Sequence, residues 1–192
     1  MQPEKFSRGH RQPDSGGTGI EADFFSNALS GDVMLFGLSY FTVFHVFISL
    51  LAIGSGLIAA SAYTNGRLPK FTTAFFLLMT LATNLTGFVF PFKGVTPAFT
   101  LGIISSVVFA ISVLALYAFR LSGLWRAIYA VGALILLYLN VFVLVVQLFL
   151  KIPPLHALAP NGNEPVFFIT QGVVFMLFLI GGYRAVRRFH PA

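Results

Sequence analysis

His45 stands in the apolar segment YFTVFHVFISL, and it is the only histidine inside the long apolar segments of this chain. A neutral imidazole can ligate haem iron, share a hydrogen bond with a quinone or relay a proton near neutral pH. An ionisable side chain within a membrane span is a functional hypothesis by default. The alternative is structural, with a neutral His45 that bonds Asn84, Asn140 or a backbone carbonyl.

Side-chain amides are the other strongly polar groups in these segments. An unpaired amide in hydrocarbon costs several kcal/mol, so the faces that carry amides should turn inward and meet. We expect a polar cluster that includes His45 in the outer half of the bundle or near its midplane, where 'outer' is the side away from the cytoplasm. The sequence therefore predicts a cofactor-binding site made of His45, Asn84 and Asn140, with Gln147 and Gln171 at its rim.

A quinone fits this set of residues better than a haem held by two histidines. A second ligand, His156, would come from the outer loop at a shallower level, whereas a quinone needs only one or two hydrogen-bond donors and an apolar slot lined by aromatic residues. A haem with one histidine ligand, or one shared across a dimer, stays open. The slot has candidate aromatic walls, which plain packing would explain equally: Tyr40, Phe41, Phe44, Phe47 and Tyr138.

The elements that must position these residues are membrane-spanning helices. Of 192 residues, 57% are hydrophobic and 9% are charged, whereas soluble domains carry about 25% charged residues. A bilayer core of about 30 Å needs about 20 helical residues. Five apolar segments have about this length or more: 33–62, 71–92, 97–119, 127–150 and 166–183.

The predicted fold is therefore an all-α integral membrane protein, a bundle of five transmembrane helices over residues 33–183. Residues 1–32 are polar and rich in Gly, Pro and charge, and predict a flexible tail. Most connections are short, so consecutive helices should be antiparallel neighbours. Small residues at four-residue spacing (Ala52, Gly56 and Ala60) favour close helix approach, although chance explains them equally.

Basic residues predict the orientation, because cytoplasmic loops carry an excess of Lys and Arg. One side would hold seven of them, and the other Lys93 and Lys151. We expect residues 184–192 in the cytoplasm, the 1–32 tail outside, and a bacterial inner membrane as the location. Trp125, Tyr129 and Tyr183 should form an aromatic belt at the cytoplasmic interface. The seven basic residues on the predicted cytoplasmic side are Arg67, Lys70, Arg120, Arg126, Arg184, Arg187 and Arg188.

Other chemistries find little support in the sequence. There is no cysteine, which excludes disulfides, iron–sulfur clusters and thiolate zinc sites. His156 and Glu164 lack metal-ligand spacing, so no metal site is predicted. Because the basic residues lie at segment ends, no nucleic-acid partner is expected. The Arg184, Arg187 and Arg188 cluster is an orientation signal first, and a site for anionic lipid heads second.

Three functions remain open, and the sequence does not decide whether the chain is an enzyme. The first is a small redox-associated inner-membrane protein with a quinone- or haem-type site around His45. The second is a non-catalytic accessory or structural subunit of a membrane complex. The third is a carrier for a small neutral or apolar molecule. Expected partners are the lipid bilayer and other membrane subunits or further copies of this chain.

Overall fold

The computed structural model describes residues 34–35, 38–90 and 96–190. The chain divides into two compact units, Met1–Val43 and Phe44–Ala192. In the first unit, the strands β1 (Met34–Leu35) and β2 (Leu38–Ser39) pair antiparallel, with Met34 opposite Ser39. The predicted tail, residues 1–32, lies outside the described residues.

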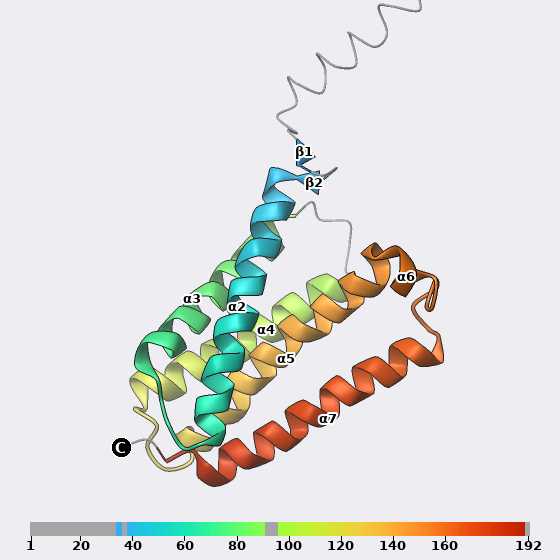
Figure 1. Ribbon diagram of the computed structural model, residues 1–192. Coiled ribbons are helices and arrows are strands. Elements are labelled where there is room, and N and C mark those ends of the chain that lie inside the picture. The colour runs from blue at the N-terminus through green and yellow to red at the C-terminus, as the bar shows by residue number, and fades with distance from the viewer. Residues whose placement is uncertain (1–33, 36–37, 91–95, 191–192) are drawn as a thin grey trace, which may run out of the picture. The chain divides into compact units, whose positions relative to one another are not determined.

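Five helices in the described part of the chain are long and apolar enough to cross a membrane. The predicted all-α membrane bundle is thereby confirmed (Figure 1). A short helix, α6 (Pro153–His156), lies in the connection before the last span. The spans are α2 (Tyr40–Thr64), α3 (Lys70–Val89), α4 (Pro97–Val113) with its π-helical continuation η1 (Leu114–Ala118), α5 (Trp125–Lys151) and α7 (Pro165–Arg188).

The first and last helices differ most from their predicted bounds. α2 begins at Tyr40 rather than at residue 33, because Met34–Leu35 and Leu38–Ser39 pair as strands before it. α7 continues to Arg188 rather than ending at Tyr183, and its last turn carries arginines that suit the negative end of a helix dipole. The late start of α2 places His45 about 8 Å along the helix from its beginning, closer to the helix end than the sequence indicated.

Proline and threonine fix two of the helix starts. Pro97 and Pro165 occupy first-turn positions, where the missing N–H is not needed. Thr96 caps α4 by accepting a hydrogen bond from the Phe99 backbone N–H at 3.2 Å. These starts follow the predicted boundaries of the third and fifth spans.

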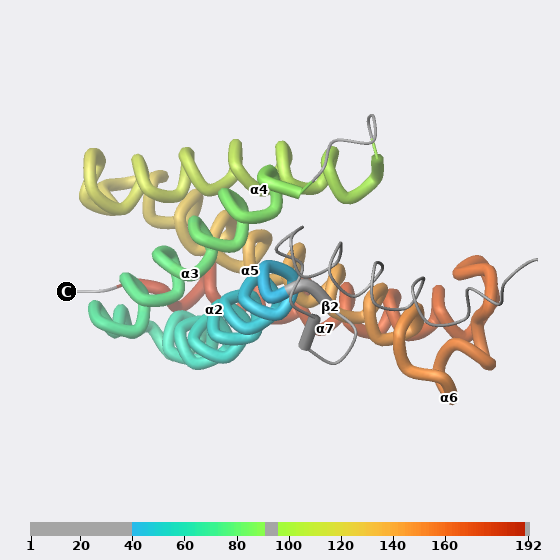
Figure 2. The backbone as a smooth tube through the Cα atoms, turned by 90° about the horizontal axis from the view of Figure 1, so that it is seen from above, coloured from blue at the N-terminus to red at the C-terminus, as the bar shows by residue number. Residues whose placement is uncertain are grey.

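Helix α5 lies between two neighbours within the Phe44–Ala192 unit. It packs against α4 on one side and α7 on another (Figure 2). Gly132 of α5 faces the Ser112 side chain of α4, with no room for a Cβ between them. A Cβ on Gly56 of α2 would lie 2.6 Å from Leu137 Cδ1. Glycine therefore sets the spacing at two contacts, and Gly56 belongs to the small-residue repeat noted in the sequence.

The described helices form a bundle with two chemically different ends. The seven basic residues predicted to share one side lie where α2 and α7 end and where α3 and α5 begin. We call this the basic end, and the opposite one the His45 end. The larger buried apolar cluster includes Tyr63, Tyr129 and Phe189 of the basic end. A smaller one at the His45 end contains Val145 and Phe149.

Candidate functional site

The imidazole of His45 is held by α3. Its Nδ1 lies 2.7 Å from Thr86 Oγ1, and that same oxygen lies 2.7 Å from the Ala82 carbonyl oxygen. A threonine hydroxyl has one proton to donate, and a carbonyl can only accept. We assign the hydroxyl proton to the Ala82 carbonyl. In this assignment Nδ1–H of His45 donates to Thr86, which acts as the acceptor.

This assignment gives a neutral His45 its proton on Nδ1. With the proton on Nδ1, the lone pair is on Nε2. Among the described residues, Nε2 has no hydrogen-bond partner, and the side chain is half-buried. Histidines that ligate metals are oriented in the same manner, by a bond from the other ring nitrogen. The arrangement presents a lone pair that can accept a proton donor or bind a metal.

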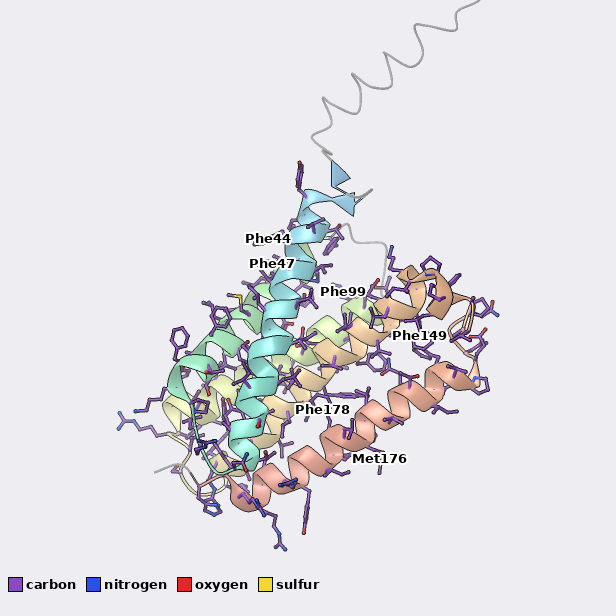
Figure 3. All side chains as sticks on the ribbon, in the orientation of Figure 1. Phe44, Phe47, Phe99, Phe149, Met176 and Phe178 are labelled. Atoms are coloured by element: carbon purple, nitrogen blue, oxygen red, sulfur yellow. The ribbon has the colours of Figure 1, made fainter. Side chains whose placement is uncertain are left out.

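Apolar contacts complete the surroundings of the His45 ring. The Phe90 ring meets the imidazole edge-on, with 5.2 Å between ring centroids. Gly87 faces the ring, and a Cβ placed there would be 3.7 Å from Cε1 of His45. One hydrogen bond and contacts with α3 thus position the imidazole, while Phe44 and Phe47 are exposed on α2 (Figure 3).

One turn further along, a second pair of hydroxyls lies between α2 and α3. Ser49 Oγ donates to the His45 carbonyl at 2.7 Å and lies 3.5 Å from Thr83 Oγ1. Thr83 in turn donates to the Met79 carbonyl at 2.9 Å. His45 and Ser49, expected on one face of the first span, therefore both face α3.

The two asparagines predicted beside His45 have other partners. Asn84 lies on α3 but accepts a hydrogen bond from Ser105 of α4 at 3.0 Å, and its Nδ2 is buried without a partner among the described residues. Asn140 donates to the Leu136 carbonyl of its own helix at 3.0 Å. An amide can be satisfied by a neighbouring hydroxyl or backbone carbonyl, so neither needs to reach His45. Their membership of one binding site stays a prediction.

The predicted rim residues belong to the α5–α7 region. Gln171 is buried and donates to the Phe142 carbonyl at 3.2 Å, while its Oε1 has no partner in the described part of the chain. Gln147 is exposed. Tyr138, a predicted slot residue on α5, packs against the ring of Phe178 on α7. The polar residues are thus distributed over three helix contacts, α2–α3, α3–α4 and α5–α7.

A buried hydroxyl network at the basic end was not anticipated from the sequence. Tyr63 Oη lies 2.9 Å from both Thr73 Oγ1 and Tyr129 Oη. The Phe189 ring packs on Tyr63 and Tyr129, with centroid distances of 5.2 and 5.9 Å. Tyr129 is 0% exposed, which contradicts its predicted place in an interfacial belt. The only signal was three hydroxyl residues near span ends, a pattern equally typical of a belt.

Glu164 is the only acidic residue in the described part of the chain, and it precedes α7 at the His45 end. Its carboxylate accepts hydrogen bonds from Asn161 N, Asn161 Nδ2 and Asn163 N, each at 3.0 Å. Partial desolvation acts to raise the pKa of this carboxyl, but the hydrogen bonds together outweigh it and hold the pKa below its ordinary value of 4.5. The carboxylate thus links residues 161–164 of the loop before α7 by hydrogen bonds.

Comparison with known proteins found no matching family model, no matching curated protein and no matching solved structure. The function must therefore be inferred from the site itself.

Proposed function

We propose that this chain is a small redox-associated membrane protein that binds a quinone-type molecule at His45, in its reduced quinol form. The observation that supports this is the hydrogen bond from His45 Nδ1 to Thr86, which leaves the Nε2 lone pair as the reactive feature. A quinol hydroxyl can donate to that lone pair. A quinone carbonyl only accepts, so it has no partner on a neutral His45.

The place of His45 along α2 suits such a ligand. His45 is about 8 Å from the start of the helix, where a polar ring head can stay near the interface while its apolar tail enters hydrocarbon. Phe44 and Phe47 are exposed on α2, one and two positions from His45. Positions this close on a helix do not face each other, and the ring that contacts the imidazole is that of Phe90, at 5.2 Å between centroids.

The orientation and location form part of the proposal. The seven basic residues at one end support a cytoplasmic C-terminus in a bacterial inner membrane. The His45 end then faces outward. A reporter enzyme fused after Ala192 tests this, because the proposal requires activity inside the cytoplasm, and activity only outside would reverse the assignment.

Ligand binding to the purified protein tests the site. We expect a short-chain quinol to bind more tightly than its oxidised form, and extracted protein to carry quinone. Thr86→Val removes the acceptor of Nδ1–H and should weaken quinol binding about tenfold. The matched control is Thr170→Val, because Thr170 bonds only the Val166 carbonyl of its own helix.

Spectroscopy separates a quinol from a haem at the same nitrogen. A Soret band that shifts on reduction and disappears in His45→Ala would make His45 a haem ligand and overturn the quinol assignment. Quinol binding that is unchanged in His45→Leu would refute a His45 site of any kind.

A second candidate function is that of an accessory subunit of a membrane complex, favoured by the helix-to-helix bonds. Ser105 to Asn84 and Gln171 to the Phe142 carbonyl tie neighbouring helices together. In that case the His45–Thr86 bond is one more such tie. His45→Leu would then destabilise the bundle or a native complex, while the purified protein would bind no quinol and no haem.

A further inference from the structure

A groove runs along the outer surface between α2 and α3, on the part of these helices nearer the basic end. Its volume is about 370 Å³, within the range of about 300–1,000 Å³ that small-molecule sites occupy. Its lining is mainly apolar, and the Ser55 hydroxyl in it is already bonded to the Leu51 carbonyl at 2.7 Å. The groove therefore suits a hydrocarbon chain better than a polar molecule.

Two features of the sequence keep this groove open. Gly54 contributes no side chain, and a Cβ built on it would meet nothing within 4 Å. Phe71 is 84% exposed and stacks on Phe75, with 6.4 Å between centroids and 13° between ring planes. The stacked rings form a wall of the groove on α3, opposite the space at Gly54 on α2.

Two exposed basic residues lie close in sequence to the α3 wall of the groove. Lys70 directly precedes Phe71 at the start of α3, Arg67 lies in the preceding connection, and both are exposed. No carboxylate of the described residues neutralises them, because the only one, that of Glu164, precedes α7 at the opposite end. The site is thus apolar along its length and positive at one end.

We propose that this groove is a binding site for an anionic phospholipid, with an acyl chain along the groove and the phosphate at Lys70 and Arg67. Charge complementarity favours an anionic head group at this site, and the apolar lining favours an acyl chain along the groove. The lipid belongs to the leaflet on the basic side. This site is separate from His45, and the proposal does not depend on the quinol assignment.

Lipid titration of the delipidated protein in a neutral detergent, followed by native mass spectrometry, tests the proposal. We expect phosphatidylglycerol to bind at least tenfold more tightly than phosphatidylcholine with the same chains. Gly54→Leu fills the groove and should weaken phosphatidylglycerol binding about tenfold. The control is Gly172→Leu on α7, where a Cβ also meets nothing within 4 Å. Leucine is the better helix former, so both variants should fold.

Two substitutions of basic residues, one at the proposed site and one distant from it, test the head-group assignment. Lys70→Gln should weaken phosphatidylglycerol binding and leave phosphatidylcholine binding unchanged, whereas Lys151→Gln should change neither, because Lys151 lies in the last turn of α5 at the opposite end. Equal binding of the two lipids, or wild-type binding by Gly54→Leu, would overturn the proposal. Full competition by soluble glycerol phosphate would also overturn it, because a head group alone would then account for binding.

Discussion

The two ends of the bundle use the same kind of contact, a hydroxyl between two helices beside an aromatic ring, with opposite results. At the basic end, the Tyr63 hydroxyl contacts both Thr73 and Tyr129, and all three side chains are buried. At the His45 end, one ring nitrogen is bonded to Thr86, and the ring is only half-buried. The first arrangement is closed, and the second leaves a polar atom without a protein partner in the described residues.

This difference indicates which end of the bundle contributes more to its stability. A buried polar network with its members paired rigidifies a core, and Phe189 packs over the tyrosine pair from the end of α7. A binding site needs an accessible group that is not already paired. We therefore expect substitutions at the basic end to reduce stability most, and those around His45 to change ligand binding.

The strongest test of this contrast truncates one phenylalanine at each end. Phe189 is 1% exposed and Phe44 is 54% exposed. Phe189→Ala should lower the free energy of unfolding by about 3 kcal/mol, since it leaves a cavity against two tyrosine rings. Phe44→Ala should cost much less. Equilibrium unfolding in mixed micelles measures both, and equal losses would remove the distinction between the ends.

A smaller effect is expected from the hydroxyl at the centre of the network. Tyr63→Phe keeps the ring and removes the two hydrogen bonds to Thr73 and Tyr129. It should cost about 2 kcal/mol, because buried hydroxyls are left without their partner. Tyr183→Phe is the control, since Tyr183 is 65% exposed. Wild-type stability of Tyr63→Phe would mean that the network does not contribute.

A still smaller effect on stability is expected from the hydrogen bond between α3 and α4. Ser105→Ala removes the donor to Asn84 Oδ1 and should cost about 0.6 kcal/mol, the average for side-chain hydrogen bonds within membranes. Ser106→Ala is the matched control, because Ser106 bonds only the Gly102 carbonyl of its own helix. The same unfolding experiment distinguishes them, and a loss equal in both would assign no role to the interhelical bond.

The smallest effect concerns the Glu164 loop at the His45 end. Its folded pKa is lowered, so its hydrogen bonds contribute stability that is complete above pH 4.5 and is lost as the pH falls through the folded pKa. The amide proton resonances of Asn161 and Asn163 should titrate with a midpoint below 4.5. They should not titrate in Glu164→Gln, and a midpoint above 4.5 would contradict the bonded carboxylate.

Much of the fold followed from local sequence. Span lengths, prolines at helix starts and clustered basic residues are local signals, and five helices occur close to where they predict. The start of α2 and the end of α7 were less well predicted, because apolar and basic residues near span ends are compatible with either helix or loop.

The candidate site was predictable only in part. His45 was recognisable as the one histidine within the spans, but its partner Thr86 was not, because many threonines in the spans bond only their own helix. Asn84 and Asn140 were expected beside His45, yet each has a nearer partner, Ser105 for one and the Leu136 carbonyl for the other. Polarity indicates which residues need a partner, not which partner satisfies them.

By itself, the sequence determined that this protein spans a membrane with five helices, because too few charged residues are present to cover a water-facing surface. It also determined that the basic residues gather at one end. Only the tertiary structure decided that Tyr63 and Tyr129 share a closed network and that His45 Nδ1 pairs with the Thr86 hydroxyl. Helix rotation and spacing make these choices, and they depend on glycine contacts such as Gly56 against Leu137 of a helix distant in sequence.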